Sequence, residues 1–446
     1  MSSQHPPRRR HVVIALAVAS GAASLAVRAE TLEDLRAQIE SLRNQVYALE
    51  RKQAASGHPD ASTAADAVTS GATKGSFKLP GSSTSVTLGG YVKLDAVFSN
   101  PSAGVDSAAD LQLNPSNITV GPSAGEHERN QVKFGARETR LFAKTSTPTT
   151  LGDFNTHVEV DFYGVDGNES VSNSHGLRLR HAYATLGRFL AGQTWTNFMN
   201  PATLPETLDF GGPVGQIFDR QAQVRWTQAF AASGWYAPGQ WSVGLENPET
   251  VAQVPGGGTF RADDDRFPDI TGQVRFDTSR GKFSVHGILR QVRVDSAAAP
   301  AVTDQRLGGA FSVAGIVPVI GNDDVRFTAS AGNAIGRYSD GFFPDAVVDD
   351  RGRLALPQQW GLFGAYRHFW SDTLRSSLVL SMAHESNPAN APGNTNRETR
   401  SAHVNLIWSP VANSDVGVEY IRADRQTQDG LRGHVNRLQA SAKFTF

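Results

Sequence analysis

The sequence contains no cysteine. It therefore has no disulfide framework, no thiolate metal ligand and no thiol nucleophile. Apart from one run near the N-terminus, no stretch approaches the roughly 20 apolar residues that a membrane-spanning helix needs. Hydrophobic residues make up only 39% of the chain, so hydropathy alone suggests a soluble protein. The strands of a membrane β-barrel also escape a hydropathy scan, because their lipid-facing and inward-facing residues alternate.

The apolar run at the N-terminus predicts a signal peptide. Three arginines at 8–10 precede apolar residues 12–26, and the sequence Val-Arg-Ala at 27–29 fits a signal-peptidase site. A charged start, a short apolar run and a small-residue cleavage site are typical of secretory signals. We predict that residues 1–29 direct the chain through the inner membrane by the general secretory route. Their removal takes away four arginines and no acid, which changes the formal charge from −1 to −5.

Residues 30–52 carry a heptad pattern that predicts a coiled-coil helix. The apolar residues recur at spacings of three and four, at Leu32, Leu35, Ile39, Leu42, Val46 and Leu49. A helix this short is marginal alone in water, so we expect it to associate with copies of itself in a homotrimer. A helix packed on its own domain is the alternative. Residues 53–83 are rich in Ala, Ser, Thr and Gly and predict a flexible linker.

From residue 84 onward the chain alternates between apolar and polar residues in about sixteen segments, which predicts strands. Short turns such as 187–188 and 278–280 alternate with long polar loops such as 100–128 and 333–357. This alternation is typical of up-and-down barrels with short periplasmic turns and long external loops. We predict an all-β fold, a transmembrane antiparallel β-barrel over residues 84–446. The connection 228–240 is the weakest point of this prediction, because it is long for a periplasmic turn.

The apolar faces of the strands are predicted to face lipid. An apolar interior would be too wide to fill in a barrel of this many strands, which instead encloses an aqueous channel. We therefore expect outer-membrane lipid and lipopolysaccharide to surround the barrel. The last strand, 438–446, alternates in the same way and ends on an aromatic residue. It resembles the closing strand of an outer-membrane barrel, so Phe444 and Phe446 are predicted to be the signal for the barrel-assembly machinery.

The inward faces of the strands carry about twice as many bases as acids. The predicted pore-lining, anion-binding residues are Arg140, Lys144, Arg178, Arg180, Arg225, Arg275, Arg326 and Arg367. The same face holds Arg290, Arg437 and Lys443, together with the acids Glu138, Glu159, Asp161, Asp277 and Glu419. Arginine rings in a pore favour anions, and a guanidinium group binds a carboxylate through two hydrogen bonds. The alternative is that these arginines only neutralise the acids beside them.

The segment 197–215 mixes apolar, acidic, glycine and proline residues, whereas a purely external loop would be more polar. We predict that it folds into the barrel and narrows the pore, with its carboxylates facing the arginines. The residues of this predicted constriction loop are Asn197, Phe198, Asn200, Glu206 and Asp209. The alternative is an external loop packed on a neighbouring loop or subunit.

Other motifs are too weak to predict a site. Residues 121–125 match the G-x-S-x-G pattern of a serine nucleophile, but that motif needs a strand-to-helix turn and this one lies in a Pro/Ser/Gly loop. The acidic run 263–265 lacks the spacing of a calcium loop, and no histidine pair has zinc-site spacing. We therefore predict no catalytic residue, metal, cofactor or nucleic-acid partner. A barrel with a structural or enzymatic role and no open pore remains the alternative function.

The combination of signal peptide, short heptad segment, linker and sixteen-strand pattern resembles the DcaP-type trimeric porins of Gram-negative outer membranes. The most family-like stretches are 177–200 and 204–210. The resemblance implies an outer-membrane homotrimer that passes small carboxylates, dicarboxylic acids among them, by passive diffusion. Only the strand with Arg178 and Arg180 and the loop after it match closely enough to be assigned to the pore by resemblance.

Overall fold

The computed structural model of the chain describes residues 39–48, 51, 68–101, 111–122, 124, 129–165, 172, 174–233, 237–256, 258–262, 264–296, 302–339 and 342–446. The chain divides into two units, residues 1–67 and 68–446. In the first unit residues 39–48 are helical, and Ile39, Leu42 and Val46 of the heptad pattern are exposed. The predicted signal peptide and residues 53–67 of the predicted linker lie outside the described residues. No helix in the described ranges is both long and apolar enough to cross a membrane.

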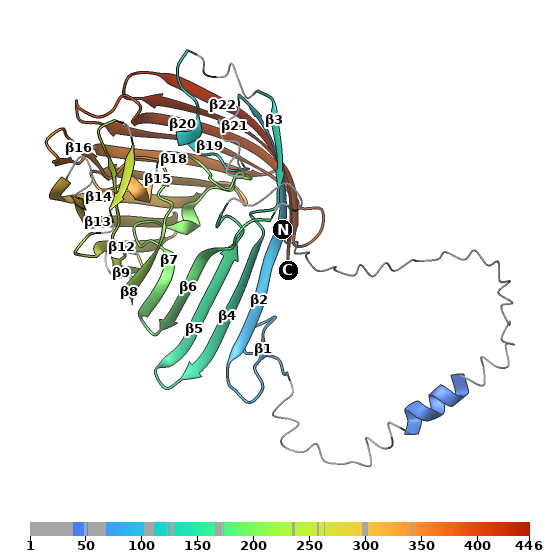
Figure 1. Cartoon of the computed structure of the whole chain (residues 1–446). Coiled ribbons are helices and arrows are strands. Elements are labelled where there is room, and N and C mark those ends of the chain that lie inside the picture. The colour runs from blue at the N-terminus through green and yellow to red at the C-terminus, as the bar shows by residue number, and fades with distance from the viewer. Residues whose placement is uncertain are drawn as a thin grey trace, which may run out of the picture. The chain divides into compact units, whose positions relative to one another are not determined.

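The second unit is a barrel of sixteen antiparallel strands within the described residues, each paired with its neighbours in chain order (Figure 1). The strands are β2 (Ser85–Asn100), β3 (Gln131–Gly135) with β4 (Arg140–Thr149), β5 (Gly152–Asp161), β6 (Arg178–Leu186), β7 (Phe189–Trp195), β8 (Arg220–Phe230), β9 (Gly239–Glu246), β12 (Asp269–Thr278), β13 (Gly281–Ser296), β14 (Val302–Pro318), β15 (Asp324–Gly332), β18 (Gln358–Phe369), β19 (Leu374–Ser386), β20 (Asn396–Trp408), β21 (Ser414–Thr427) and β22 (Arg432–Thr445). The predicted fold class is thereby confirmed.

The second strand of the barrel is interrupted. β3 and β4 both pair with β2, so that Asp95 lies opposite Gly135 and Tyr91 lies opposite Arg140. Residues 136–139 between them leave the strand. The sequence pattern does not reveal this break, because a short interruption leaves the period of two intact on either side.

The barrel closes where the first strand meets the last. β2 pairs with β22, and Tyr91 lies opposite Thr445. The amide of Phe446 donates a hydrogen bond to Gly90 O at 3.0 Å, and the amide of Gly90 donates one to Phe446 O at 3.1 Å. The C-terminal residue therefore takes part in closure, and its side chain and that of Phe444 are exposed on the outer surface. Their role as an assembly signal stays a prediction.

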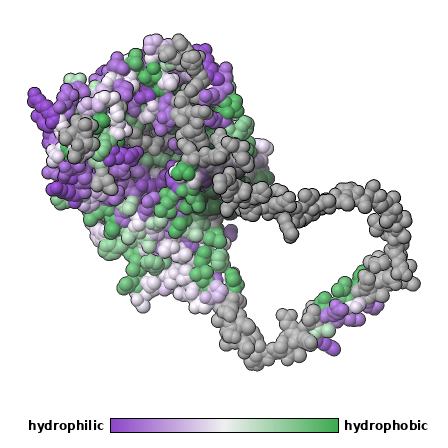
Figure 2. Space-filling model, in the orientation of Figure 1, coloured by the Kyte–Doolittle hydropathy of each residue, from purple (hydrophilic) through white to green (hydrophobic). Residues whose placement is uncertain are grey.

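The two faces of the barrel wall differ in polarity. Exposed apolar side chains on the outside include Leu94, Val158 and Trp408, whereas Asp161 and Arg437 are fully buried on the inside. Figure 2 shows hydrophobic side chains gathered over the outer surface of β4, β5 and β6, with hydrophilic side chains above them. A closed barrel satisfies every strand's backbone groups and can therefore face lipid without an apolar interior.

Three boundaries differ from the sequence-based expectation. β8 begins at Arg220, so residues 216–219 belong to the preceding loop. The connection between β8 and β9 spans only residues 231–238, because both strands extend further than their alternation indicated. The predicted linker ends earlier than residue 83, since β1 (Phe77–Lys78) pairs with β2.

A second, small sheet is built from two of the long connections. Its strands are β10 (Thr250–Gln253), β11 (Thr259–Ala262), β16 (Ala346–Val348) and β17 (Leu354–Ala355), in the order β11-β10-β16-β17. β10 and β16 are parallel, although 90 or more residues separate them. Ala252, Val292, Val294 and Val348 are among the buried residues of its apolar cluster. The sequence pattern missed this sheet because its strands are only two to four residues long.

Candidate functional site

The long connection from β7 to β8, residues 196–219, begins on the inner faces of β9, β12 and β13. The amide of Asn197 donates a hydrogen bond to Glu246 at 2.7 Å, and its side-chain Oδ1 accepts one from Ser242 Oγ at 2.7 Å. Gln273 Nε2 donates to Met199 O at 2.9 Å. Asn197 and Phe198 are fully buried. The start of the loop is therefore fixed against three strands of the barrel wall.

The loop continues toward β15. Asn200 caps the short helix η3 (Pro201–Thr203), because its Oδ1 accepts a hydrogen bond from Ala202 N at 3.2 Å. Its Nδ2 also donates to Ser284 Oγ of β13 at 3.1 Å. Arg326 of β15 donates to Leu204 O at 2.7 Å. The last two of these bonds join the loop to inward-facing side chains of β13 and β15.

Glu206 meets two arginines on the next strands. Its carboxylate accepts hydrogen bonds from Arg375 Nε at 2.9 Å and Nη2 at 2.6 Å, and Arg367 Nη1 lies 3.4 Å away. Asn405 of β20 donates to Glu206 O at 2.8 Å. Burial by itself raises the pKa of Glu206, but the hydrogen bonds and charges of Arg375 and Arg367 outweigh burial and hold the pKa below its usual range.

Leu208 and Asp209 lie where the first and last strands of the barrel, β2 and β22, meet. Lys93 Nζ of β2 and Gln439 Nε2 of β22 donate to Leu208 O at 2.7 and 3.0 Å. Asp209 lies 3.5 Å from Arg437 Nη1. Burial raises the pKa of Asp209 even though the positive charge of Arg437 acts in the opposite direction. Between Asn197 and Asp209 the loop therefore contacts inward-facing groups on strands from β9 through β22 to β2.

Aromatic rings line the return of the loop. Phe210 stacks on Tyr163 with ring centres 4.9 Å apart and meets Phe218 edge-on at 6.0 Å. The guanidinium groups of Arg178 and Arg180 lie 5.1 and 5.5 Å from the centre of the Phe210 ring, within the range of cation–π attraction. The aromatic side of the loop therefore faces β6.

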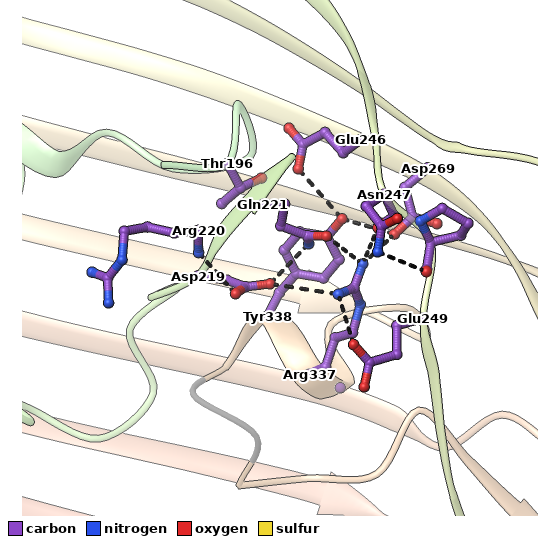
Figure 3. Close-up of polar contacts among 12 residues, drawn as sticks. Thr196, Asp219, Arg220, Gln221, Glu246, Asn247, Glu249, Asp269, Arg337 and Tyr338 are labelled. Atoms are coloured by element: carbon purple, nitrogen blue, oxygen red, sulfur yellow. Dashed lines mark hydrogen bonds and ion pairs between the residues drawn. The ribbon is translucent and has the colours of Figure 1, made fainter. Parts of the chain in front are cut away.

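The end of the loop lies beside a group of carboxylates around Arg337, which belongs to η4 (Gly336–Tyr338) in the connection from β15 to β18 (Figure 3). Arg337 Nη2 donates to Gln221 Oε1 at 2.7 Å and lies 3.1 Å from Asp269. Its Nη1 lies 3.9 Å from both Asp219 and Glu249. One arginine of an outer loop thus joins the end of the inner loop to strands β8 and β12.

Asp219 is the last residue of the loop. Its Oδ1 accepts a hydrogen bond from Arg220 N and its Oδ2 accepts one from Gln221 Nε2, both at 2.8 Å. Burial raises the pKa of Asp219 to about 6, and the positive charge of Arg337 only partly offsets this effect. Asp219 is therefore a carboxyl group whose charge changes within the mildly acidic range.

Several of the predicted pore-lining cations pair with acids. Arg178 lies 2.6 Å from Asp161, and Arg180 lies 2.7 Å from Glu159 and 2.9 Å from Asp161. Arg140 lies 3.4 Å from the same Glu159. On the other side of the barrel Arg326 and Arg367 share Asp324. These five arginines are held in place by carboxylates.

A second set of inward cations has no such partner. Among the described residues, Lys144, Arg220, Arg225 and Arg275 have no carboxylate within 4.0 Å. Arg225 Nη2 donates to Trp195 O at 2.6 Å, and the Arg220 guanidinium lies 4.4 Å from the centre of the Trp195 ring. Three strands carry these four cations, namely β4, β8 and β12, with two cations on β8.

Sequence reasoning missed Lys93, Arg220 and Arg375. Arg220 has the opposite parity to Arg225 in β8, and it faces Trp195 and Phe218 because it follows directly on the loop. Arg375 is the second residue of β19 and lies close to a turn, where the alternation of apolar and polar residues is least informative. Lys93 has the inward parity of β2, so the pattern alone could have found it.

A sixteen-stranded, lipid-facing barrel with polar walls and an inward loop defines a channel of the outer-membrane porin class. The family model described as DcaP outer membrane protein matches residues 26–446, and the chain belongs to this family. It is accordingly an outer-membrane channel of a Gram-negative bacterium and not an enzyme.

Solved structures agree with this assignment. The outer membrane channel DcaP of Acinetobacter baumannii is 25% identical, with a TM-score of 0.70 over 81% of this chain and 97% of that one. OmpF of Salmonella typhi, solved with daunomycin, is 10% identical with a TM-score of 0.52 over 81% and 98%. The anion-selective porin from Comamonas acidovorans is 11% identical with a TM-score of 0.51 over 81% and 100%, and both of these likenesses concern the fold alone. A search of curated proteins finds no significant match.

Proposed function

We propose that the protein is a passive outer-membrane channel that prefers small anions, dicarboxylates among them, and that it works as a homotrimer. Residues 197–219 form its constriction in this proposal. The inward cations of β4, β6, β8, β12, β15 and β18 line the path of the solute. Barrel-assembly machinery inserts the chain through its C-terminal strand.

The observation that carries this proposal is the uneven pairing of charge inside the barrel. The loop carboxylates Glu206 and Asp209 lie against Arg375, Arg367 and Arg437. They therefore do not neutralise Lys144, Arg220, Arg225 and Arg275, which keep an excess of positive charge on the wall of β4, β8 and β12. Arginine and lysine side chains that line a pore without carboxylate partners favour anions. A guanidinium group also suits carboxylates because it offers two parallel donors.

The contacts of the loop support the constriction. Its backbone accepts hydrogen bonds from Arg326, Asn405, Lys93 and Gln439, which belong to strands spread round the barrel. An external loop would not reach inward-facing groups on so many strands. The exposed apolar positions of helix 39–48 support self-association, since a short amphipathic helix needs a partner to bury its seam.

The test is conductance of the purified protein in planar bilayers, with the reversal potential measured across a KCl gradient. We expect current steps in groups of three and a reversal potential displaced toward that of chloride, followed by current block when a dicarboxylate is titrated. A reversal potential on the potassium side would contradict the anion preference and leave a porin. The absence of any conductance would support a barrel without an open pore.

A further inference from the structure

The outer surface of the barrel is charged in one sector. On β20, β21 and β22 the residues that point away from the lumen near the long connections are Glu398, Arg400, Arg422, Asp424, Arg432 and His434, which we call the outer charged patch. Their outward direction follows from the register, because Asn405, Glu419 and Gln439 pair across the same strands with the opposite parity and are buried inside. Arg400 lies opposite Asp424, which in turn lies opposite His434.

The patch contains more positive than negative charge. Arg400 Nη2 lies 2.8 Å from Glu398, and Arg422 Nη2 lies 2.8 Å from Asp424. Arg432 is exposed and forms no ion pair with a described residue. The side chain of Arg400 is 60% exposed, so its remaining N–H groups are open to a ligand. Each guanidinium has five donors, and a single carboxylate uses at most two of them.

The patch lies at the outer boundary of the membrane. Below it on the same outward faces are Val404, Trp408, Tyr420 and Leu438, all exposed and apolar or aromatic. A membrane-spanning strand needs about 10 residues to cross an apolar band about 25 Å tall. Arg400 is eight residues from Trp408, an aromatic residue at the opposite edge of the band. The arginines are therefore at the height of lipid headgroups, on the side of the long connections.

Other sectors of the wall are different at this end. On β12 and β14 the outward side chains toward the long connections include Ile270 and Leu307, and Phe267 precedes β12. All three are exposed and apolar. These three positions present apolar surface where β20–β22 present charge, although the exposed Arg306 lies directly before Leu307.

We propose that the outer charged patch binds the phosphorylated headgroup of lipopolysaccharide in the outer leaflet. The patch also borders a pocket of about 280 Å³ lined by Glu398, Arg400, Asp424 and Arg432, among others. Phosphate oxygens accept hydrogen bonds from the arginine forks, and the acyl chains lie along the apolar surface formed by Val404, Tyr420 and Leu438. The paired carboxylates keep the arginines extended over the lipid surface in this arrangement. This inference does not depend on the ion preference of the pore.

The test compares lipid bound to protein extracted from outer membranes. The triple variant Arg400→Gln, Arg422→Gln, Arg432→Gln removes the three cations of the patch. The matched control Arg261→Gln, Arg351→Gln, Arg353→Gln removes three exposed arginines of the long connections, two of which are also ion-paired. Lipid A per chain is measured by mass spectrometry after detergent washing. We expect the patch variant to retain at least about tenfold less lipid A than the wild type and the control.

Two results would overturn the proposal. Equal lipid A in the patch variant and the control would show that the arginines do not hold the headgroup. Dissociation of the oligomer by the patch variant, with lipid A per chain unchanged, would assign the patch to a contact between copies of the chain. Heat-dependent migration on gels checks that the variant is folded. If the triple variant does not fold, the single substitution Arg432→Gln, at a side chain outside the ion pairs, gives the same comparison.

Discussion

Two regions of the inner wall use the same residue type in different ways. On β18, β19 and β22, Arg367, Arg375 and Arg437 contact the carboxylates of the inner loop. On β8 and β12, Arg225 and Arg275 have no acid partner within the described residues. The first group fixes the loop, and the second leaves positive charge in the lumen. Counting arginines on the inner face therefore overstates the charge that a solute meets, because part of it is neutralised by the loop.

Removing the loop carboxylate should have the largest effect on this contrast. In the Glu206→Gln variant, Arg375 loses two strong hydrogen bonds from its guanidinium and Arg367 loses a nearby charge. Loss of one partner of such a pair costs about 3 kcal/mol or more when it is buried, and less at this half-buried site. We expect higher single-channel conductance and a stronger anion preference, both measured in bilayers. The control Asp349→Asn, which changes an ion pair in an outer loop, should leave both values unchanged.

The second prediction compares two arginine pairs of equal charge. Arg225→Gln with Arg275→Gln removes cations without acid partners, and Arg178→Gln with Arg180→Gln removes cations paired with Asp161 and Glu159. Two unit charges 4 Å apart interact by about 1 kcal/mol in water-like surroundings. We therefore expect the first variant to lower the chloride-to-potassium permeability ratio about fivefold. The second should also lower it, by a smaller factor. An equal or greater loss in the second variant would contradict the distinction between the two regions.

A third prediction concerns acid. Because the pKa of Asp219 is raised to about 6, lowering the pH from 7 to 5 removes a negative charge beside Arg337. Anion preference should therefore rise with a midpoint near pH 6, and the Asp219→Asn variant should lack this change. Its folded-state pKa lies above the ordinary value of about 3.9, so protonation also stabilises the folded wild type as pH falls from 6 toward 4. Reversal potentials measured across this pH range test the rise in anion preference, and urea unfolding tests the rise in stability.

The smallest expected effect is at the aromatic side of the loop. The Phe210→Leu variant loses ring stacking with Tyr163 and the cation–π contacts of Arg178 and Arg180. Such contacts are worth about 0.5–1 kcal/mol each at partly exposed sites. We expect more open-channel current noise with little change in selectivity. A change in selectivity as large as that of the Arg225 and Arg275 variant would contradict the assignment of this side to loop packing.

The barrel could be predicted from the sequence because its rule is local. A period of two places Arg225, Arg275 and Arg437 on one face without knowledge of any other strand. The same rule could not show which of them are neutralised, since Glu206 meets Arg375 across 169 residues of sequence. It also failed at Arg220, where the path of the loop rather than the strand sets the direction of the side chain. Whether an arginine is paired with a carboxylate depends on tertiary contacts, which the alternation of residues along one strand does not reveal.

The small sheet of β10, β11, β16 and β17 has a consequence for engineering and for surface recognition. Its parallel pair joins two long connections that lie far apart in sequence, so they form one folded unit. A peptide tag inserted at the turn between β10 and β11 should be displayed without disturbing the unit, because that turn is at its edge. A tag inserted within β16 should break its pairing with β10 and so disorder both connections. An antibody raised against the intact surface would therefore recognise residues from both connections and fail to bind a peptide copied from either one.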